Sequence, residues 1–153
     1  MKVAIITDQH FGARNDSPIF LDYYQKFYEE TFFPRIKEEK INAVLILGDT
    51  FDRRKYVNFY SLQRAKKMFF DPLAERGIEV HMLVGNHDTY YKNTNDVHSP
   101  GLVLDYKNIN IISEGNNKAD GLYLWNFREE QKPIHTGFNT TGLCLDVAEG
   151  YDF

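Results

Sequence analysis

The stretch that decides the fold is residues 42–52, Asn-Ala-Val-Leu-Ile-Leu-Gly-Asp-Thr-Phe-Asp, in which a short apolar run passes directly into polar groups. A run of this length and composition, ended by glycine, predicts a buried β-strand. Two further stretches have the same form, namely residues 2–10 (KVAIITDQH) and residues 79–88 (EVHMLVGNHD). Because the carboxyl ends of parallel strands meet at one edge of a sheet, we expect the three polar clusters to lie together.

Helical patterns occupy the segments between these strands. The first begins at Ser17 and Pro18, a capping hydroxyl followed by a favoured first residue. The residues at helical spacing are Phe20, Tyr23, Tyr24, Phe27 and Thr31. Pro34 is expected to break or kink this helix.

The second helical pattern runs from about Asn58 to Arg76, and Pro72 is expected to separate its last turn. Its predicted apolar stripe is Phe59, Leu62, Ala65, Phe69 and Leu73, which leaves Arg64 and Lys67 exposed. A weaker fourth unit combines a helix over residues 100–106 with a strand over residues 108–113. The alternation of strands and helices predicts an α/β fold, a mostly parallel sheet with flanking helices.

The character of the sequence changes after Ser113. Residues 114–121 are rich in turn formers, while residues 122–127 and 143–147 are candidates for short antiparallel strands. We therefore divide the chain into residues 1–113 and a divergent tail, residues 114–153.

Composition narrows the class of protein. A chain of 153 residues with a net charge of -4 is predicted to be one globular domain without a general attraction for nucleic acid. No apolar run approaches the length of a membrane span, so we expect no membrane association. A single cysteine, Cys144, excludes an internal disulfide and suits a reducing cytoplasm. From Arg53 to Phe70 there are six basic residues and no acidic one.

The first two polar clusters offer metal ligands. Asp8 and His10, two residues apart in an extended segment, are expected to point the same way and to hold one divalent ion. Asp49, with two carboxylate oxygens, can bridge two ions. The alternatives are turn-capping carboxylates and a surface histidine, and Asp52 is expected to lie outside the ligand set.

The third cluster joins a candidate ligand to candidate catalytic groups. Asn86 can give its amide oxygen to a second ion, and His87 is then free to act on a substrate as a proton donor or charge stabiliser. Asp88 is predicted to orient the His87 imidazole through its other nitrogen. The alternative is that Asn-His-Asp is only a turn.

Together these clusters resemble the Asp-x-His, Gly-Asp-x-x-Asp and Gly-Asn-His-Asp motifs of the calcineurin-like metallophosphoesterases. Residues 46–55 and 84–93 are most similar to the SbcD-type nucleases, especially the recombination endonuclease subunits of T-even-like phages. The resemblance covers about residues 1–113. It implies the N-terminal half of a two-sheet sandwich and a two-metal DNA phosphodiesterase.

The resemblance also implies a cofactor and partners. Two manganese ions are expected, with magnesium as a substitute. Asp8, His10 and Asp49 would hold the first ion, Asp49 and Asn86 the second, while His87 assists at the scissile phosphate. The implied partners are DNA, an SbcC-type coiled-coil ATPase and a second copy of the chain. The implied location is the cytoplasm, that of the host if the protein is phage-encoded.

The family also uses a later histidine and a Gly-His-x-His motif, which this sequence does not contain. His98 and His135 are the remaining candidates, whereas His81 lies inside a predicted strand and is expected to pack. The expectation is therefore a truncated or rearranged family member. Two alternative functions follow, a catalytically incomplete remnant that binds DNA or the full-length subunit, and a phosphomonoesterase or protein phosphatase.

Candidate DNA contacts flank the second and third motifs. Arg53, Arg54 and Lys55 follow the second motif and can contact phosphates, while Tyr90 and Tyr91 follow the third and can stack on bases. The alternatives are a solvated basic helix, which includes Lys66 and Lys67, and aromatic packing.

Overall fold

The structure is a computed structural model that describes residues 2–113, 115–119, 122–127 and 142–147. Its strands are β1 (Val3–Ile6), β2 (Ala43–Ile46), β3 (Glu79–Leu83), β4 (Ile109–Ile112), β5 (Gly115–Ala119), β6 (Leu122–Phe127) and β7 (Gly142–Val147). Its helices are α1 (Ala13–Asp16), α2 (Pro18–Phe27), α3 (Phe33–Glu38), α4 (Phe59–Ala65), α5 (Asp71–Glu75) and α6 (Ser99–Val103). Two π-helical segments, Tyr28–Phe32 and Lys66–Phe70, join α2 to α3 and α4 to α5.

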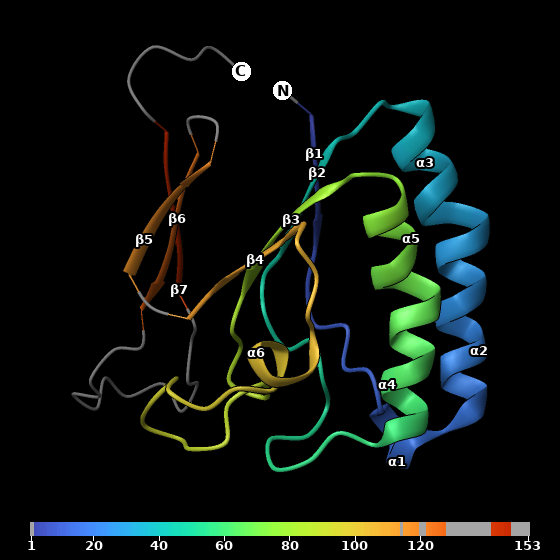
Figure 1. The fold of residues 1–153 in the computed structure, drawn as a ribbon, viewed down its shortest axis with the longest axis horizontal. Coiled ribbons are helices and arrows are strands. Elements are labelled where there is room, and N and C mark those ends of the chain that lie inside the picture. The colour runs from blue at the N-terminus through green and yellow to red at the C-terminus, as the bar shows by residue number, and fades with distance from the viewer. Residues whose placement is uncertain (1, 114, 120–121, 128–141, 148–153) are drawn as a thin grey trace.

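The first four strands form one parallel sheet in the order β1-β2-β3-β4 (Figure 1). Figure 1 shows α2 to α5 side by side on one side of this sheet. Sequential parallel strands with right-handed crossovers place every crossover helix on the same face. The predicted α/β fold with a parallel sheet and helical crossovers is therefore confirmed, including the weaker fourth unit that became α6 and β4.

Alternating strand residues supply the two faces of this sheet. Val44 and Ile46 are fully buried in the large core between the sheet and the helices. Leu45, between them in sequence, belongs to a smaller cluster with Leu83 and Ile112 on the other face. Because successive side chains of a strand point to opposite faces, both faces of β2 must be covered, and its burial is complete.

The prolines do not break the helices as expected. The residue before each proline donates its backbone N–H five residues back, Phe33 to the Tyr28 carbonyl and Asp71 to the Lys66 carbonyl. A proline inside an α-helix lacks a donor and its ring collides with the carbonyl of the preceding turn. The wider π turn relieves this conflict and lets the helix continue past Pro34 and Pro72.

The predicted buried faces of the two helices are wrong in part. In α2, Leu21 is buried, while Tyr23 is 69% and Phe27 45% exposed. Phe59, in the first turn of α4, is 87% exposed, although Ala65 and, further along the helical layer, Phe69 and Leu73 are buried as expected. Arg64, expected to be exposed, is half-buried and donates to Asp22 Oδ1 at 2.7 Å. Tyr23, Phe27 and Phe59 all precede the π segments, and the spacing of apolar residues alone does not predict which face of each helix is buried.

The remaining three described strands form a separate antiparallel sheet in the order β5-β6-β7. The strands expected over residues 122–127 and 143–147 correspond to β6 and β7. The division of the chain at Ser113 stays a prediction.

Candidate metal centre

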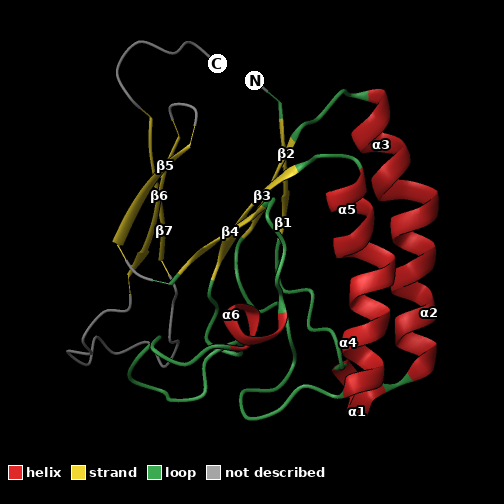
Figure 2. Cartoon of the chain, in the orientation of Figure 1, coloured by secondary structure: helices red, strands yellow, loops and turns green. Residues whose placement is uncertain are grey.

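The three motifs lie in the loops that follow β1, β2 and β3, at the carboxyl ends of these strands, and the loops are adjacent (Figure 2). Backbone hydrogen bonds join the first two loops. The N–H of Asp8 donates to the Gly48 carbonyl at 3.2 Å, that of His10 to the Asp49 carbonyl at 2.9 Å, and that of Phe11 to the Thr50 carbonyl at 2.9 Å. These bonds extend the β1–β2 pairing beyond the strands and fix the ligand-bearing loops against each other.

The backbone of these loops is strained at the candidate ligands. Asp8, His10 and Asp49 have φ values of 52°, 44° and 52°, in the left-handed region that non-glycine residues rarely adopt. The prediction that Asp8 and His10 point the same way because they lie in an extended segment is therefore wrong, since β1 has already ended at Ile6. Strain of this kind persists only where the surroundings over-determine it, and it concentrates at functional sites.

Asp8, His10 and Asp49 nonetheless come together. One ligand atom from each lies within 4.8 Å of the other two. His10 Nε2 is 3.7 Å from Asp8 Oδ1 and 4.0 Å from Asp49 Oδ2. These separations are too long for hydrogen bonds but suit atoms that share a cation between them. Two carboxylates and an imidazole form a donor set that fits a divalent ion, and the structure brings together all three predicted ligands of the first ion.

Asn86 lies at the edge of this cluster. With its amide oriented to satisfy both neighbours, Asn86 donates to Asp49 Oδ2 at 3.2 Å and accepts from Arg54 Nη2 at 3.2 Å. The amide oxygen, the atom that a second cation needs, thus faces a guanidinium. Asn86 and Asp49 are adjacent as predicted, and the guanidinium of Arg54 competes with a second ion for the same oxygen.

His87 is held with one ring nitrogen committed. Its Nδ1 lies 2.7 Å from the backbone carbonyl of Asp52. Because a carbonyl can only accept, Nδ1 carries the proton and Nε2 is the nitrogen that the ring can offer to a substrate. The His87 ring meets the His10 ring edge-on, with centroids 4.8 Å apart. The side chain predicted to act on the substrate therefore stands directly beside the candidate ion site.

The predicted contact of Asp88 with the His87 ring is wrong. Asp88 is fully buried, and its carboxylate accepts three backbone N–H groups, from Phe51 at 3.0 Å, Thr50 at 3.2 Å and Gly85 at 3.0 Å. The side chain thus ties the second motif loop to the third. Burial raises the pKa of Asp88 to about 6, and the three hydrogen bonds act in the opposite direction.

Gln9 connects the centre to the helical layer. It is buried between the two candidate ligands of the first motif, and its Nε2 donates to the Tyr28 hydroxyl at 2.7 Å. Tyr28 opens the π-helical segment, so the widened turn presents this hydroxyl to the loop. Sequence analysis did not identify this contact, because nothing in the pattern distinguishes Tyr28 from the other aromatic residues of the helix.

The Tyr28→Phe variant is expected to lose about 1–3 kcal/mol of unfolding free energy, because the buried Gln9 amide keeps its donor but loses its acceptor. Urea unfolding measures this change. Tyr24→Phe, one turn earlier and half-buried, is the matched control and should change stability by less than about 0.5 kcal/mol. Equal losses in the two variants would contradict the importance of this hydrogen bond.

The other histidines lie away from the ligand set in the described part of the chain. His98 Nδ1 accepts the Gly101 N–H at 3.0 Å and caps α6, and burial lowers its pKa. His81 is buried within β3, as expected, with Nε2 3.2 Å from Glu79 Oε1. His135 falls outside the described residues.

The predicted DNA contacts differ in how they are placed. The Arg53 guanidinium is engaged within the chain, with Nη2 donating to Asn15 Oδ1 at 2.7 Å and Nη1 3.4 Å from Asp16. Arg54 lies between Asn86 and a surface cavity. Tyr90 is exposed, with the Lys55 ammonium 5.8 Å from its ring centre.

Asp52 takes a larger part in the site than its sequence position indicated. Its carbonyl fixes the His87 ring, and its Oδ1 lies 3.5 Å from His10 Nδ1. The Gly-Asp-x-x-Asp motif could have indicated that the Asp52 side chain belongs to the site. The contact between the Asp52 carbonyl and His87 has no counterpart in the sequence pattern.

Comparison with known proteins identifies the class. The chain matches the calcineurin-like phosphoesterases over residues 1–151 and belongs to that family of metal-dependent hydrolases. It is also 29% identical over 119 residues to exonuclease subunit 1 of Enterobacteria phage T4, a match that covers 74% of this chain and 33% of the phage protein. The expected resemblance is confirmed, but the family match extends to residue 151, beyond the residues 1–113 that were expected to carry it. The chain spans about a third of the length of this phage relative. Among the described residues, no helix is long and apolar enough to cross a membrane.

Proposed function

We propose that this chain cleaves phosphodiester bonds of DNA with a two-ion site, manganese being the expected metal and magnesium the substitute. The observation that carries the proposal is the convergence of Asp8, His10 and Asp49 beside His87 at one edge of the sheet. The similarity to a phage exonuclease subunit supports DNA as the substrate.

Each side chain has a separate task in this proposal. Asp8, His10 and Asp49 would hold the first ion, and Asp49 with Asn86 the second. A bound divalent ion would polarise the phosphoryl oxygens and neutralise their charge. His87, with Nδ1–H fixed on the Asp52 carbonyl, directs Nε2 to the leaving oxygen or to charge on the phosphate. Asp88 acts as a positioning residue through the backbone it binds.

Hydrolysis of a labelled DNA oligonucleotide by the purified chain, with and without manganese, tests this function. Asp49→Asn keeps the size of the side chain but removes the shared carboxylate, and it should lower the rate by roughly a hundredfold or more. Cleavage that needs manganese and is lost in this variant is the expected result. Cleavage that persists in the variant would assign the activity to a contaminant and overturn the proposal.

A second candidate function is a remnant that binds DNA or the full-length subunit without cutting. It is favoured by the described histidines, because His98 caps a helix and His81 is packed in a strand. Oligonucleotide binding without hydrolysis would establish it. A third candidate is a phosphomonoesterase, which would hydrolyse p-nitrophenyl phosphate but leave DNA intact.

We further propose a homodimer that works with an SbcC-type ATPase in the cytoplasm. Apolar side chains on α2 remain exposed without a described partner surface, among them Ile19 at 66% and Tyr23 at 69%. A patch of this kind on a helix is typical of an interaction surface. A Tyr23→Asp variant should shift the mass measured by light scattering from dimer to monomer, whereas Lys37→Asp on α3 should not. A monomeric wild-type chain would exclude self-association through α2.

A further inference from the structure

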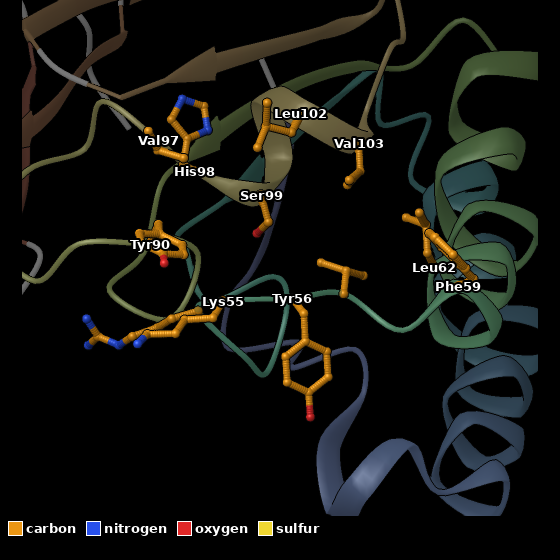
Figure 3. Close-up of a pocket in the computed structure, with 12 residues that line it drawn as sticks. Lys55, Tyr56, Phe59, Leu62, Tyr90, Val97, His98, Ser99, Leu102 and Val103 are labelled. Atoms are coloured by element: carbon orange, nitrogen blue, oxygen red, sulfur yellow. The ribbon is translucent and has the colours of Figure 1, made fainter.

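A cavity of about 260 Å³ lies beside the candidate metal centre (Figure 3). Figure 3 shows Tyr90, Val97 and His98 on one side of it and Phe59 and Leu62 of α4 on the other, with Leu102 on α6. Its walls are apolar, and Arg54 and Lys55 are its charged lining residues. The volume falls below the range of about 300–1,000 Å³ of drug-sized ligand sites and suits a single planar ring system.

The cavity is built from direct continuations of two motif loops. Residues 54–57 follow the second motif, and residues 90–99 follow the third. The Ser99 N–H donates to the Asp88 carbonyl at 2.8 Å, and the Tyr90 N–H donates to the Val97 carbonyl at 2.9 Å. The walls are therefore fixed to the same backbone that presents Asp49, Asn86 and His87.

Arg54 connects the cavity with the metal centre. It lines the cavity and also donates from Nη2 to the Asn86 amide oxygen at 3.2 Å. Lys55, the next residue, is exposed and has its ammonium 5.8 Å from the Tyr90 ring centre. Two cations without an acidic lining residue favour an anionic group at this end, next to the ions that would hold a scissile phosphate.

Large apolar side chains at the cavity are unusually exposed. Phe59 is 87% and Leu102 75% exposed, and Tyr90 is 41% exposed. Aromatic and apolar surfaces beside a cationic rim are the elements from which proteins build sites for unpaired bases, since every base has a π-face. A paired base offers only its edge and cannot enter such a cavity without leaving the stack.

We propose that this cavity binds one unpaired nucleobase of a DNA strand, with the adjoining phosphate on Arg54 and Lys55. This proposal rests on the proposed function and deepens it, because it makes a single-stranded or locally unpaired nucleotide next to the cut the preferred substrate. Tyr90 stacks on the base, and Leu102 closes the cavity from α6.

The proposal is tested by measuring how a fluorescent oligothymidylate of twelve nucleotides binds to the full chain. Calcium replaces manganese in this assay to prevent cleavage. Tyr90→Ala should weaken binding by about tenfold, whereas Tyr90→Phe, which keeps the ring, should bind like the wild type. Leu102→Trp, a substitution at an exposed position, should fill the cavity and also weaken binding. A backbone of the same length without bases should bind more weakly and be indifferent to all three changes.

The outcomes separate the cavity from the chemistry of the metal centre. Hydrolysis of the base-free strand by the wild-type chain in manganese reports that chemistry alone, because this strand has no base or other planar ring to enter the cavity. Equal weakening of the thymidylate and the base-free strand would overturn the base pocket while the proposed function stands. Base-dependent binding without hydrolysis of either strand would support the base pocket and contradict the proposed nuclease function. A wild-type chain that binds neither strand would overturn the pocket.

Discussion

The Gly85→Ala variant is expected to lose about 3 kcal/mol of unfolding free energy and to lose manganese binding at the candidate metal centre. A Cβ atom at Gly85 would lie 2.1 Å from the Asp49 backbone nitrogen and 2.2 Å from Asp49 Oδ1. Neither distance is tolerated between non-bonded atoms, and the first involves backbone that cannot rotate away. The loop after β2 or the loop after β3 must therefore move.

This movement would act on the candidate ligands directly. The His87 N–H donates to Asp49 Oδ1 at 2.8 Å, and Asp49 shares the candidate ion site with Asp8 and His10. Displacing Asp49 by about 1 Å separates these groups, and misplacement on that scale costs about a hundredfold in rate where geometry is the source of catalysis. Urea unfolding and calorimetric manganese titration measure the two losses.

Gly77→Ala is the matched control for this substitution. Gly77 ends α5 with φ of 64°, and a Cβ there meets nothing within 4 Å. The added methyl group should cost only the strain of a left-handed alanine, about 1 kcal/mol, and should leave manganese binding unchanged. If the two variants unfold at the same urea concentration and bind manganese equally, the close approach of Gly85 to Asp49 is not present in solution.

The composition of the centre was predictable from sequence because it depends on topology. Asp8, Asp49 and Asn86 each follow an apolar run, and parallel strands bring their carboxyl ends to one edge whatever the details of the loops. The parallel arrangement of the strands and the residues around the candidate ion site were both predictable from these apolar runs that end in polar groups.

The local geometry was not predictable in the same way. Asp8 and His10 reach the site through a left-handed backbone, which depends on the hydrogen bonds to the Gly48 and Asp49 loop rather than on their spacing. The Asp52 carbonyl fixes His87, and a backbone atom has no residue preference to reveal it. The π turn before Pro34 accommodates the proline within the helix, and no spacing of apolar residues indicates it.

Asp88→Asn is expected to remove a large pH dependence of stability. In the folded chain the pKa of Asp88 is raised from 3.8 to about 6, chiefly by burial. The folded state therefore binds this proton more tightly than the unfolded state, and the stabilisation is complete below about pH 3.8 and lost as pH rises through about 6. The shift corresponds to about 3 kcal/mol lost between pH 4 and 7.

The asparagine also changes the hydrogen bonds that join the two loops. Oδ2 of Asp88 accepts from Thr50 and Gly85, and Oδ1 accepts from Phe51. An asparagine has one oxygen, so its NH₂ group must face at least one of these backbone donors, which costs about 1–3 kcal/mol. The unfolding free energy of the wild type should thus exceed that of the variant by the largest margin near pH 4, and this margin should be smaller at pH 7.

Urea unfolding of both chains at pH 4, 5, 6 and 7, without divalent ions, measures this difference. Subtracting the variant from the wild type cancels the carboxylates that the two chains share. Asp105→Asn, at an exposed carboxylate outside the motif loops, is the control and should show a constant difference. A difference that is likewise constant for Asp88→Asn would mean that the buried carboxylate keeps its ordinary affinity for protons. The three backbone donors would then outweigh its burial, and Asp88 would hold the loops together as a permanent charge rather than as a group whose stabilisation depends on pH.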